Sequence, residues 1–249
     1  MKSRILGVDF DNLTPEAAVG RFLELLEGDA PAVVVTPNPE MVMLTRKDAD
    51  FHKILNSADL CVPDGTGVVW ASKYSQSRIR QRVPGIELAL NVMESPEGRA
   101  KRWFFLGGAP GVAQEAKDAM EARFEGLEVV GTHHGYFGEQ DENELIEKIA
   151  ASGADIVLVG LGFPRQEKWI DAHKHRLGAA VLMGVGGSFD VMSGRLKRAP
   201  KLFRKLRLEW FYRLLRQPSR IWRQRVLVKF VFAVIFQKRR AGDDGKGNA

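Results

Sequence analysis

The chain has 249 residues, 45% of them hydrophobic, so it can bury a substantial core in one large domain and is neither disordered nor fibrous. It holds a single cysteine, Cys61, which excludes an internal disulfide framework, and no Cys and His residues stand at zinc-site spacing. The net charge of +6 is unevenly distributed: residues 1–194 contain 20 Lys and Arg against 28 Asp and Glu, whereas residues 195–249 contain 17 against 3.

Short apolar runs alternate with segments of helical periodicity from residue 4 to residue 190, and each run ends in turn residues. The runs predicted as strands are residues 4–10, 32–39, 58–65, 102–111, 154–164 and 179–190. The helices predicted between them include residues 14–28, 111–126, 141–153 and 164–178. This alternation is typical of an α/β fold, with a largely parallel sheet flanked by helices.

The loops after the predicted strands are the candidate ligand site, because the crevice of an open α/β sheet lies beyond the carboxyl ends of its strands. These loops carry polar or glycine-rich groups from distant parts of the sequence. They are Thr36, Asn38 and Glu40, the turn 64–66, the glycine-rich turns 107–111 and 184–190, and Gln166. We expect them to converge at one rim of the sheet.

Two motifs have competing interpretations. The glycine-rich turn 107–111 runs from strand to helix, as phosphate-binding loops do, but it lacks the Walker lysine and the full G-x-G-x-x-G pattern, so a simple tight turn fits equally well. Asp9 and Asp11 match the D-x-D pattern by which many sugar transferases hold a divalent metal. Because Asp11 and Asn12 precede a predicted helix, we favour a role in a turn or helix cap and predict no metal site.

The basic segment, residues 195–240, combines cations with aromatic and apolar side chains. If Pro218 does not change the helical phase, one face would carry Arg213, Arg216, Arg220 and Arg223. Residues 226–236 are apolar except for Lys229 and, at about 16 Å as a helix, reach half of a ~30 Å hydrocarbon core. These features favour a helix lying in the interface of an anionic membrane over plain packing on the core. Nucleic-acid binding is disfavoured because it does not explain the apolar run.

The first seven residues lack the basic start and long apolar core of a secretory signal, and nowhere do eighteen apolar residues run together. We therefore expect the chain on the cytoplasmic side, peripheral to the inner face of the cell membrane. Residues 241–249 are of low complexity and are predicted to be disordered.

Eight separated blocks, in unchanged order between about residue 5 and residue 225, resemble the WecG/TagA/CpsF glycosyltransferase family. They are TPNPEMV, VPDGTGVV, RVPGIEL, FFLGGAPGV, HHGYF, VGLGFPRQEKWI, GVGGSFDVMSGRLKRAP and EWFYRLLRQPSR. Within the family, they are most similar to the wall-teichoic-acid N-acetylmannosaminyltransferases. The resemblance implies a variant Rossmann-like fold and an inverting enzyme without metal or other cofactor. It also implies UDP-N-acetylmannosamine as donor and the 4-hydroxyl of undecaprenyl-diphosphate-linked N-acetylglucosamine as acceptor, in surface-polymer synthesis.

The resemblance also implies roles for individual residues. Asp64 is the implied general base, and a position between Pro63 and Gly65 would hold its carboxylate on a rigid turn at the crevice rim. An Asp in such a turn also commonly bonds its own backbone. The other implied residues are Thr36, Asn38, Arg82 and Gln166 near the donor, Tyr136 and Asp190 at the uracil or ribose, and Arg213, Arg220 and Arg223 at the diphosphate.

Taken together, the sequence predicts a catalytic domain over residues 1–194, an appendage over residues 195–240 that completes the active site on the membrane, and a tail over residues 241–249. Apolar surface bared by displacement of the appendage would favour self-association away from the membrane. Two other functions stay open, a dinucleotide-dependent oxidoreductase and a non-catalytic membrane-surface module. The donor sugar also stays open, because the choice between N-acetylmannosamine, its uronic acid and another hexose depends on few contacts.

Overall fold

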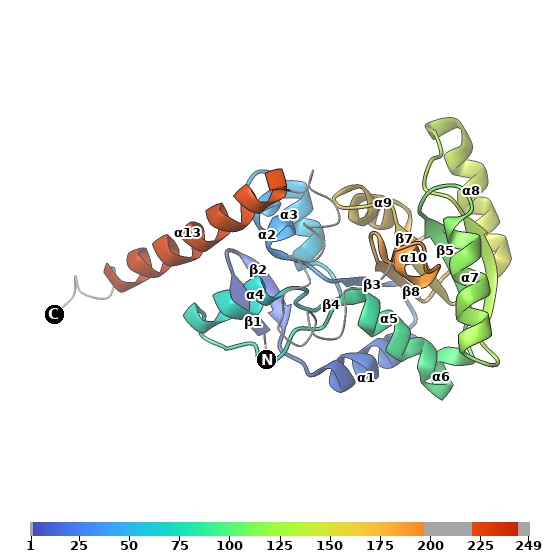
Figure 1. Cartoon of the computed structure of the whole chain (residues 1–249), viewed down its shortest axis with the longest axis horizontal. Coiled ribbons are helices and arrows are strands. Elements are labelled where there is room, and N and C mark those ends of the chain that lie inside the picture. Colours follow the sequence, from blue (N-terminus) through green and yellow to red (C-terminus); the bar gives the residue numbers. More distant parts are fainter. Residues whose placement is uncertain (1, 197–220, 244–249) are drawn as a thin grey trace.

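The structure, a computed structural model, describes residues 2–196 and 221–243, and in the second range it describes the side chains of residues 225–237. Its central sheet has six parallel strands in the order β4-β3-β8-β7-β5-β6 (Figure 1). The strands are β3 (Ala32–Val35), β4 (Leu60–Cys61), β5 (Arg102–Gly107), β6 (Glu128–His133), β7 (Ile156–Gly160) and β8 (Val181–Gly184). The predicted α/β fold with a parallel sheet is confirmed.

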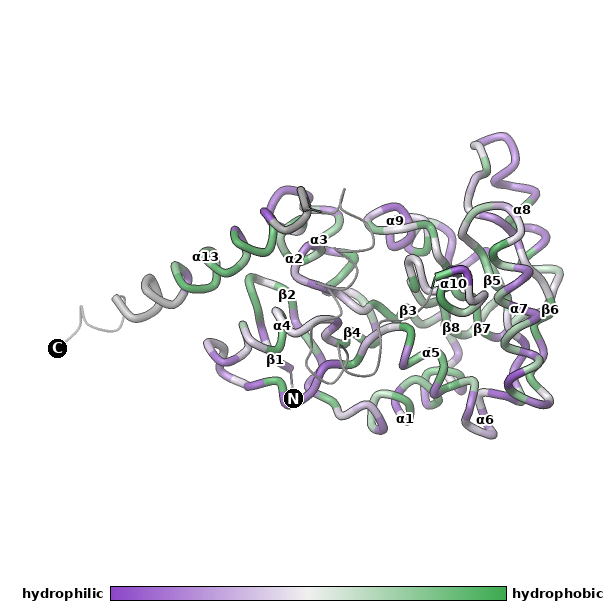
Figure 2. The backbone as a smooth tube through the Cα atoms, viewed as in Figure 1, coloured by the Kyte–Doolittle hydropathy of each residue, from purple (hydrophilic) through white to green (hydrophobic). Residues whose placement is uncertain are grey.

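Helices cover both faces of this sheet because alternate side chains of each strand enter different apolar clusters. In β5, Phe104 enters the first cluster and Phe105 the second. The first is covered by α2 (Pro39–Thr45), α3 (Ala49–Asn56), α8 (Glu139–Ser152) and α9 (Arg165–His173). The second is covered by α1 (Pro15–Leu25), α5 (Gly85–Glu94), α7 (Val112–Arg123) and α10 (Ser188–Met192). Figure 2 shows hydrophobic residues in the strands and hydrophilic ones along α7 and α8.

Shorter helical segments connect these elements. They are α4 (Thr66–Ala71), η1 (Ser72–Tyr74) and α6 (Pro96–Arg99). Helix α4 follows β4 directly, and η1 continues from α4. This pair therefore starts at the carboxyl end of the sheet and leads away from it.

The first apolar run, residues 4–10, does not enter the central sheet. It belongs to an antiparallel hairpin of β1 (Lys2–Ile5) and β2 (Val8–Asp11). Leu6 and Gly7 join the strands with φ angles of 48° and 91°, and a tight two-residue hairpin turn of this kind requires positive φ. The prediction of a sheet strand here was wrong because this turn lies inside the apolar run. The edge strand β6 was not predicted, since most of its side chains are partly exposed.

Asp11 and Asn12 join the hairpin to the rest of the protein. The Asp11 carboxylate accepts a hydrogen bond from the Cys61 amide at 2.9 Å, and the Asn12 side-chain amide donates to the carbonyl of Arg78 at 2.9 Å. Helix α1 is capped instead by Thr14, whose Oγ1 accepts a hydrogen bond from an amide of the first turn. The prediction of a cap at Asp11 and Asn12 was therefore wrong, because both side chains bind partners distant in sequence.

Helix α13 (Ile221–Asp243) contains the apolar run 226–236 and extends away from the sheet (Figure 1). It packs on α2 and α4 and contributes Phe230 and Val234, 1% and 5% exposed, to the first apolar cluster. Within the described residues, no helix has both the length and the apolar character to cross a membrane. The first residues of the tail predicted to be disordered, 241–243, are helical, and the rest of that tail lies outside the described residues.

Candidate active site

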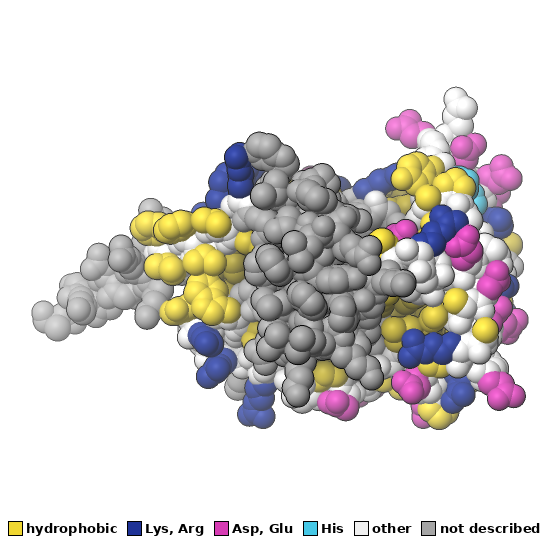
Figure 3. All heavy atoms as spheres, in the orientation of Figure 1, with side chains coloured by type: hydrophobic (Ala, Val, Ile, Leu, Met, Phe, Trp, Pro, Cys, Tyr) yellow, Lys and Arg dark blue, Asp and Glu magenta, His cyan; other side chains and the backbone are white. Residues whose placement is uncertain are grey.

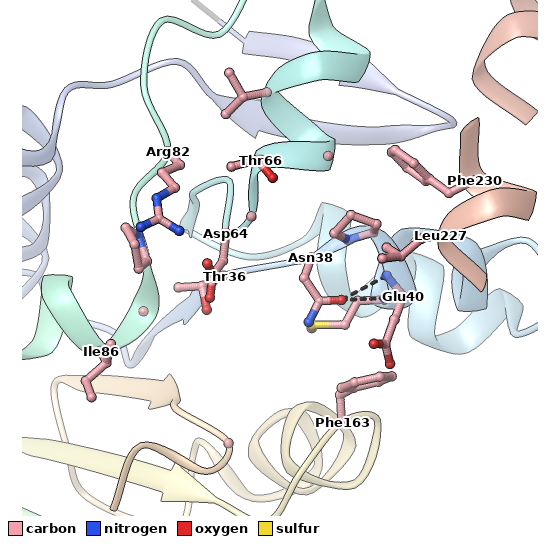
Figure 4. A pocket seen from close by; sticks show the side chains of 18 of the residues that line it. Thr36, Asn38, Glu40, Asp64, Thr66, Arg82, Ile86, Phe163, Leu227 and Phe230 are labelled. Carbon is pink, nitrogen blue, oxygen red and sulfur yellow. Dashed lines mark hydrogen bonds between the residues drawn. The ribbon is translucent and has the colours of Figure 1, made fainter. Parts of the chain in front are cut away.

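A cavity of about 1020 Å³ lies at the carboxyl ends of β3, β4, β7 and β8. These strands are neighbours in the sheet, so the loops that follow them meet although they are far apart in sequence. The loops contribute Thr36, Asn38, Asp64, Gly162 and residues 184–188. The other walls come from α4 and η1, from residues 78–86 and from α13 (Figure 4).

Asp64 lies in the turn between β4 and α4 and lines the cavity. Its amide donates a hydrogen bond to the carbonyl of Pro37 at 3.1 Å, and the carbonyl of the preceding Pro63 accepts one from the Val83 amide at 2.8 Å. Gly65 follows with φ of 104°, which glycine adopts readily and other residues rarely do, and the chain enters α4 at this point. The Asp64 carboxylate is therefore carried on a backbone fixed from two directions.

Thr36 and Asn38, from the loop after β3, line the cavity with Asp64. Figure 4 shows Thr36 beside Asp64, with the Arg82 side chain pointing toward both. Asn38 also caps α2, because its Oδ1 accepts hydrogen bonds from two amides of the first turn at 2.9 and 3.1 Å. A methyl group on Gly85 would lie 2.7 Å from Thr36 Oγ1, so the glycine allows α5 to approach the threonine.

Gln166, at the start of α9, is 5% exposed and connects two loops of the cavity. Its Oε1 accepts hydrogen bonds from the amides of Gly162 and Gly186 at 3.2 and 3.0 Å. Its Nε2 donates to Oε1 of Glu167 at 2.7 Å. Gln166 therefore fixes the backbone of the loop after β7 against that of the glycine-rich loop after β8.

Glu167 is a buried carboxylic acid that the sequence analysis did not single out. It is 1% exposed, and its Oε2 has no hydrogen-bond partner within the described part of the chain. Burial raises the pKa of Glu167 from 4.5 to about 7, although the hydrogen bond from Gln166 acts in the opposite direction. The sequence signal for the burial of Glu167 was its position three residues before the apolar Ile170, which is buried. Residues at this spacing share one face of a helix.

The chain is similar in sequence to known glycosyl transferases. The model of the glycosyl transferase WecG/TagA/CpsF family matches residues 3–244. The chain belongs to this family. A relative from Bacillus spizizenii is 39% identical over 214 residues, which cover 86% of this chain and 82% of that protein. A relative from Staphylococcus aureus is 36% identical over 241 residues, 96% of this chain and 94% of that protein. Both relatives are named N-acetylglucosaminyldiphosphoundecaprenol N-acetyl-beta-D-mannosaminyltransferase.

Of the residues that the family resemblance implies, Thr36, Asn38, Asp64, Arg82 and Gln166 line one cavity. The others are placed differently or not described.

Tyr136 is 73% exposed in the loop between β6 and α8, and neither it nor Asp190 of α10 lines this cavity. Arg213 and Arg220 lie outside the described residues. Arg223 belongs to α13, but its side chain is not among those described. The nucleotide and diphosphate roles of these five residues stay predictions.

The two carboxylates of the D-x-D pattern have partners outside the cavity. Asp9 lies 3.5 Å from Nε of Arg4, and Asp11 accepts the bond from Cys61. Over residues 2–196 and 221–243, no three His, Cys, Asp or Glu side chains form a group suited to a metal ion.

Sequence reasoning missed two further parts of the cavity wall. One consists of cations from the segment after α4, and the other is the apolar side of α13. The cations are Lys73, Arg78 and Arg80, and the apolar side chains of α13 are Leu227, Phe230 and Val231. The signal for the cations was a run without acidic residues, 72–82, within residues 1–194, which as a whole contain more acids than bases.

Proposed function

We propose that this glycosyl transferase moves N-acetylmannosamine from UDP to the 4-hydroxyl of N-acetylglucosamine on undecaprenyl diphosphate, for teichoic-acid or related surface-polymer synthesis. The names of the relatives support both the transferred sugar and the acceptor. The observation that carries the proposal is the meeting of Asp64, Thr36 and Arg82 inside a cavity at the carboxyl edge of the sheet (Figure 4). That edge is where α/β folds bind nucleotides.

Asp64 acts in this proposal as the general base. Its carboxylate accepts the proton of the acceptor hydroxyl while that oxygen bonds to the anomeric carbon of the donor. The bond from that carbon to the diphosphate breaks in the same displacement, so the configuration inverts. UDP leaves as a stabilised anion and needs no proton from an acid, so one carboxylate suffices.

The negative charge that develops on UDP requires compensation. Arg82 lines the cavity and points toward Asp64 in Figure 4, so it is the described cation that we assign to this charge. The proposed further cations are Arg213, Arg220 and Arg223, whose guanidinium groups bind diphosphate in a forked geometry. No metal or other cofactor has a part in this proposal.

The purified protein is expected to form a disaccharide on a short-chain lipid diphosphate carrying N-acetylglucosamine when UDP-N-acetylmannosamine is supplied. The measurement is product analysis by mass spectrometry and NMR, with UDP-N-acetylglucosamine and the uronic acid analogue of the donor as comparison donors. EDTA is expected to leave the rate unchanged. No product with any UDP-sugar, together with tighter binding of NAD than of UDP, would instead favour the oxidoreductase alternative.

A peripheral location on the inner face of the membrane is part of the proposal. Val228, Phe232 and Phe236 of α13 are 56%, 57% and 57% exposed, and Figure 3 shows hydrophobic side chains gathered in this part of the surface. An exposed apolar helix face next to cations favours binding to an anionic bilayer. Away from the membrane, the same face would favour self-association.

Replacing Arg213, Arg220 and Arg223 together with Gln is expected to lower turnover on the lipid-linked acceptor by at least about tenfold, because three charge-assisted contacts to diphosphate are lost. The apolar residues that attach α13 to the body are left intact. Steady-state kinetics on vesicles measures the effect, and Arg216→Gln, on the same predicted face, is the matched control. Undiminished turnover in the triple variant would remove the appendage arginines from the mechanism.

A further inference from the structure

The cavity has a basic wall with no role in the mechanism above. This basic strip consists of Lys73 of η1 and of Arg78 and Arg80, which precede α5, and all three side chains are exposed. Among the described residues, no Asp or Glu forms an ion pair with any of them. Residues 72–82 contain four cations and no acid, although residues 1–194 contain more acids than bases. The strip is therefore a local reversal of charge at the cavity.

The backbone of the basic strip is fixed before any ligand binds. The Asn12 side chain donates to the carbonyl of Arg78 at 2.9 Å and accepts from the amide of Arg80 at 3.3 Å. Between them, Ile79 is 1% exposed, and its amide donates to Oγ of Ser72 at 2.9 Å. Because Ile79 points into the core, the arginines on either side remain on the surface and line the cavity. A fixed backbone lowers the entropy cost of binding an anion.

The strip is next to the apolar side of α13. Helix α13 contacts η1 and α4, and its Leu227, Phe230 and Val231 line the same cavity. The glycine-rich loop 184–188 and Gly162 form another part of the wall, at the ends of β8 and β7. Figure 4 shows Asp64 between the segment that carries Arg82 and α13. The cavity thus has one wall formed by glycine-rich loops and another wall that combines cations with apolar side chains.

We propose that the basic strip is a second anion site, which binds the diphosphate of the polyprenyl-linked acceptor, while the apolar side of α13 contacts the first isoprene units. This inference rests on the proposed function, and it assigns the two substrates to different walls. A polyprenyl diphosphate carries both a cluster of negative charge and a hydrocarbon chain, whereas a nucleotide sugar has no hydrocarbon chain. Only the first matches cations beside apolar side chains. Binding there would position the acceptor sugar, which is attached to the diphosphate, toward Asp64.

The test compares Arg78→Gln/Arg80→Gln with a control that removes two exposed cations elsewhere, Arg123→Gln/Lys148→Gln. The acceptor is water-soluble, with N-acetylglucosamine on a short prenyl diphosphate, so that no membrane is present. The strip variant is expected to raise the KM for this acceptor by about tenfold or more, because two charge-assisted contacts are lost. The KM for the UDP-sugar is expected to stay at the native value in both variants.

Two kinetic outcomes would overturn the proposal. An equal rise in the KM for the UDP-sugar would place the donor on the strip. An effect seen with acceptor in phosphatidylglycerol vesicles but absent with the water-soluble acceptor would make the strip a contact with the lipid surface.

A binding measurement separates this inference from the proposed function. Without any donor, the native protein is expected to bind farnesyl diphosphate in calorimetry, with competition by inorganic pyrophosphate, and the strip variant is expected to bind it at least about tenfold more weakly. That result supports the basic strip as a site for prenyl diphosphate even if no sugar is transferred from UDP. If the strip variant transfers sugar with an unchanged KM for the acceptor, the proposal that the basic strip binds the acceptor diphosphate is overturned. The proposed function then still stands.

Discussion

Asp64→Asn is expected to lower turnover by about a thousandfold, since general base catalysis contributes factors of 10² to 10⁴ and an amide cannot accept the acceptor proton. The fold and UDP binding are expected to be kept. The turn is held by the Pro37 carbonyl and by the conformation of Gly65, and neither involves the carboxylate. Rapid-quench kinetics with saturating substrates measures the loss, and calorimetry with UDP measures binding.

The matched control is Asp118→Asn, an exposed carboxylate on α7 that accepts a hydrogen bond from Gln114. It is expected to leave turnover unchanged. Turnover of Asp64→Asn close to that of the control would contradict the role of Asp64 as base and would leave Asp64 as a turn residue only.

The site could be predicted from the sequence where it depends on strand ends. Thr36, Asp64 and Gln166 follow different strands or open the next helix, and polar groups after parallel strands gather at one edge. The order β4-β3-β8-β7 brings these loops into one cavity, and that order was not predicted, because it depends on which crossovers pack on which face.

The parts that were not predicted depend on contacts between distant segments. Arg78 and Arg80 look like ordinary solvated cations in the sequence, and they line the cavity because Asn12, which directly follows the β1–β2 hairpin, holds their backbone. That hairpin was itself predicted as a sheet strand. Glu167 was missed for a related reason, since a charged residue on an apolar helical face is normally read as exposed.

Glu167 has an expected effect on stability that depends on pH. In the folded protein its pKa is about 7, compared with 4.5 for an exposed Glu, so the folded state holds the proton more tightly than the unfolded state between these values. Stability therefore falls as pH rises from 4.5 to 7, and the full penalty is present above pH 7. At about 1.4 kcal/mol per pH unit, this penalty amounts to about 3 kcal/mol.

Glu167→Gln is expected to remove this pH dependence. The new side chain keeps a carbonyl oxygen for the hydrogen bond from Gln166, and it stays neutral at every pH. Its amide nitrogen takes the place of Oε2, which lacks a partner among the described residues, so a constant cost of about 1–2 kcal/mol applies at all pH values. Relative to the native protein, the variant is therefore expected to gain about 3 kcal/mol between pH 4.5 and pH 8.

Urea unfolding of both proteins at a series of pH values measures this gain as a change in the free energy of unfolding. The contributions of the other titrating groups cancel in the difference between the two free energies of unfolding. These groups include Asp48 and Glu115, whose pKa values are lowered by hydrogen bonds from Lys168 and Arg195. Glu144→Gln, at an exposed position on α8, is the matched control and is expected to show no gain. A difference between native and Glu167→Gln that stays constant from pH 4.5 to pH 8 would mean that Glu167 is ionised in the folded protein. The charge would then need a partner beside Gln166, and Gln166 would hold the glycine-rich loops next to a fixed negative charge instead of a neutral acid.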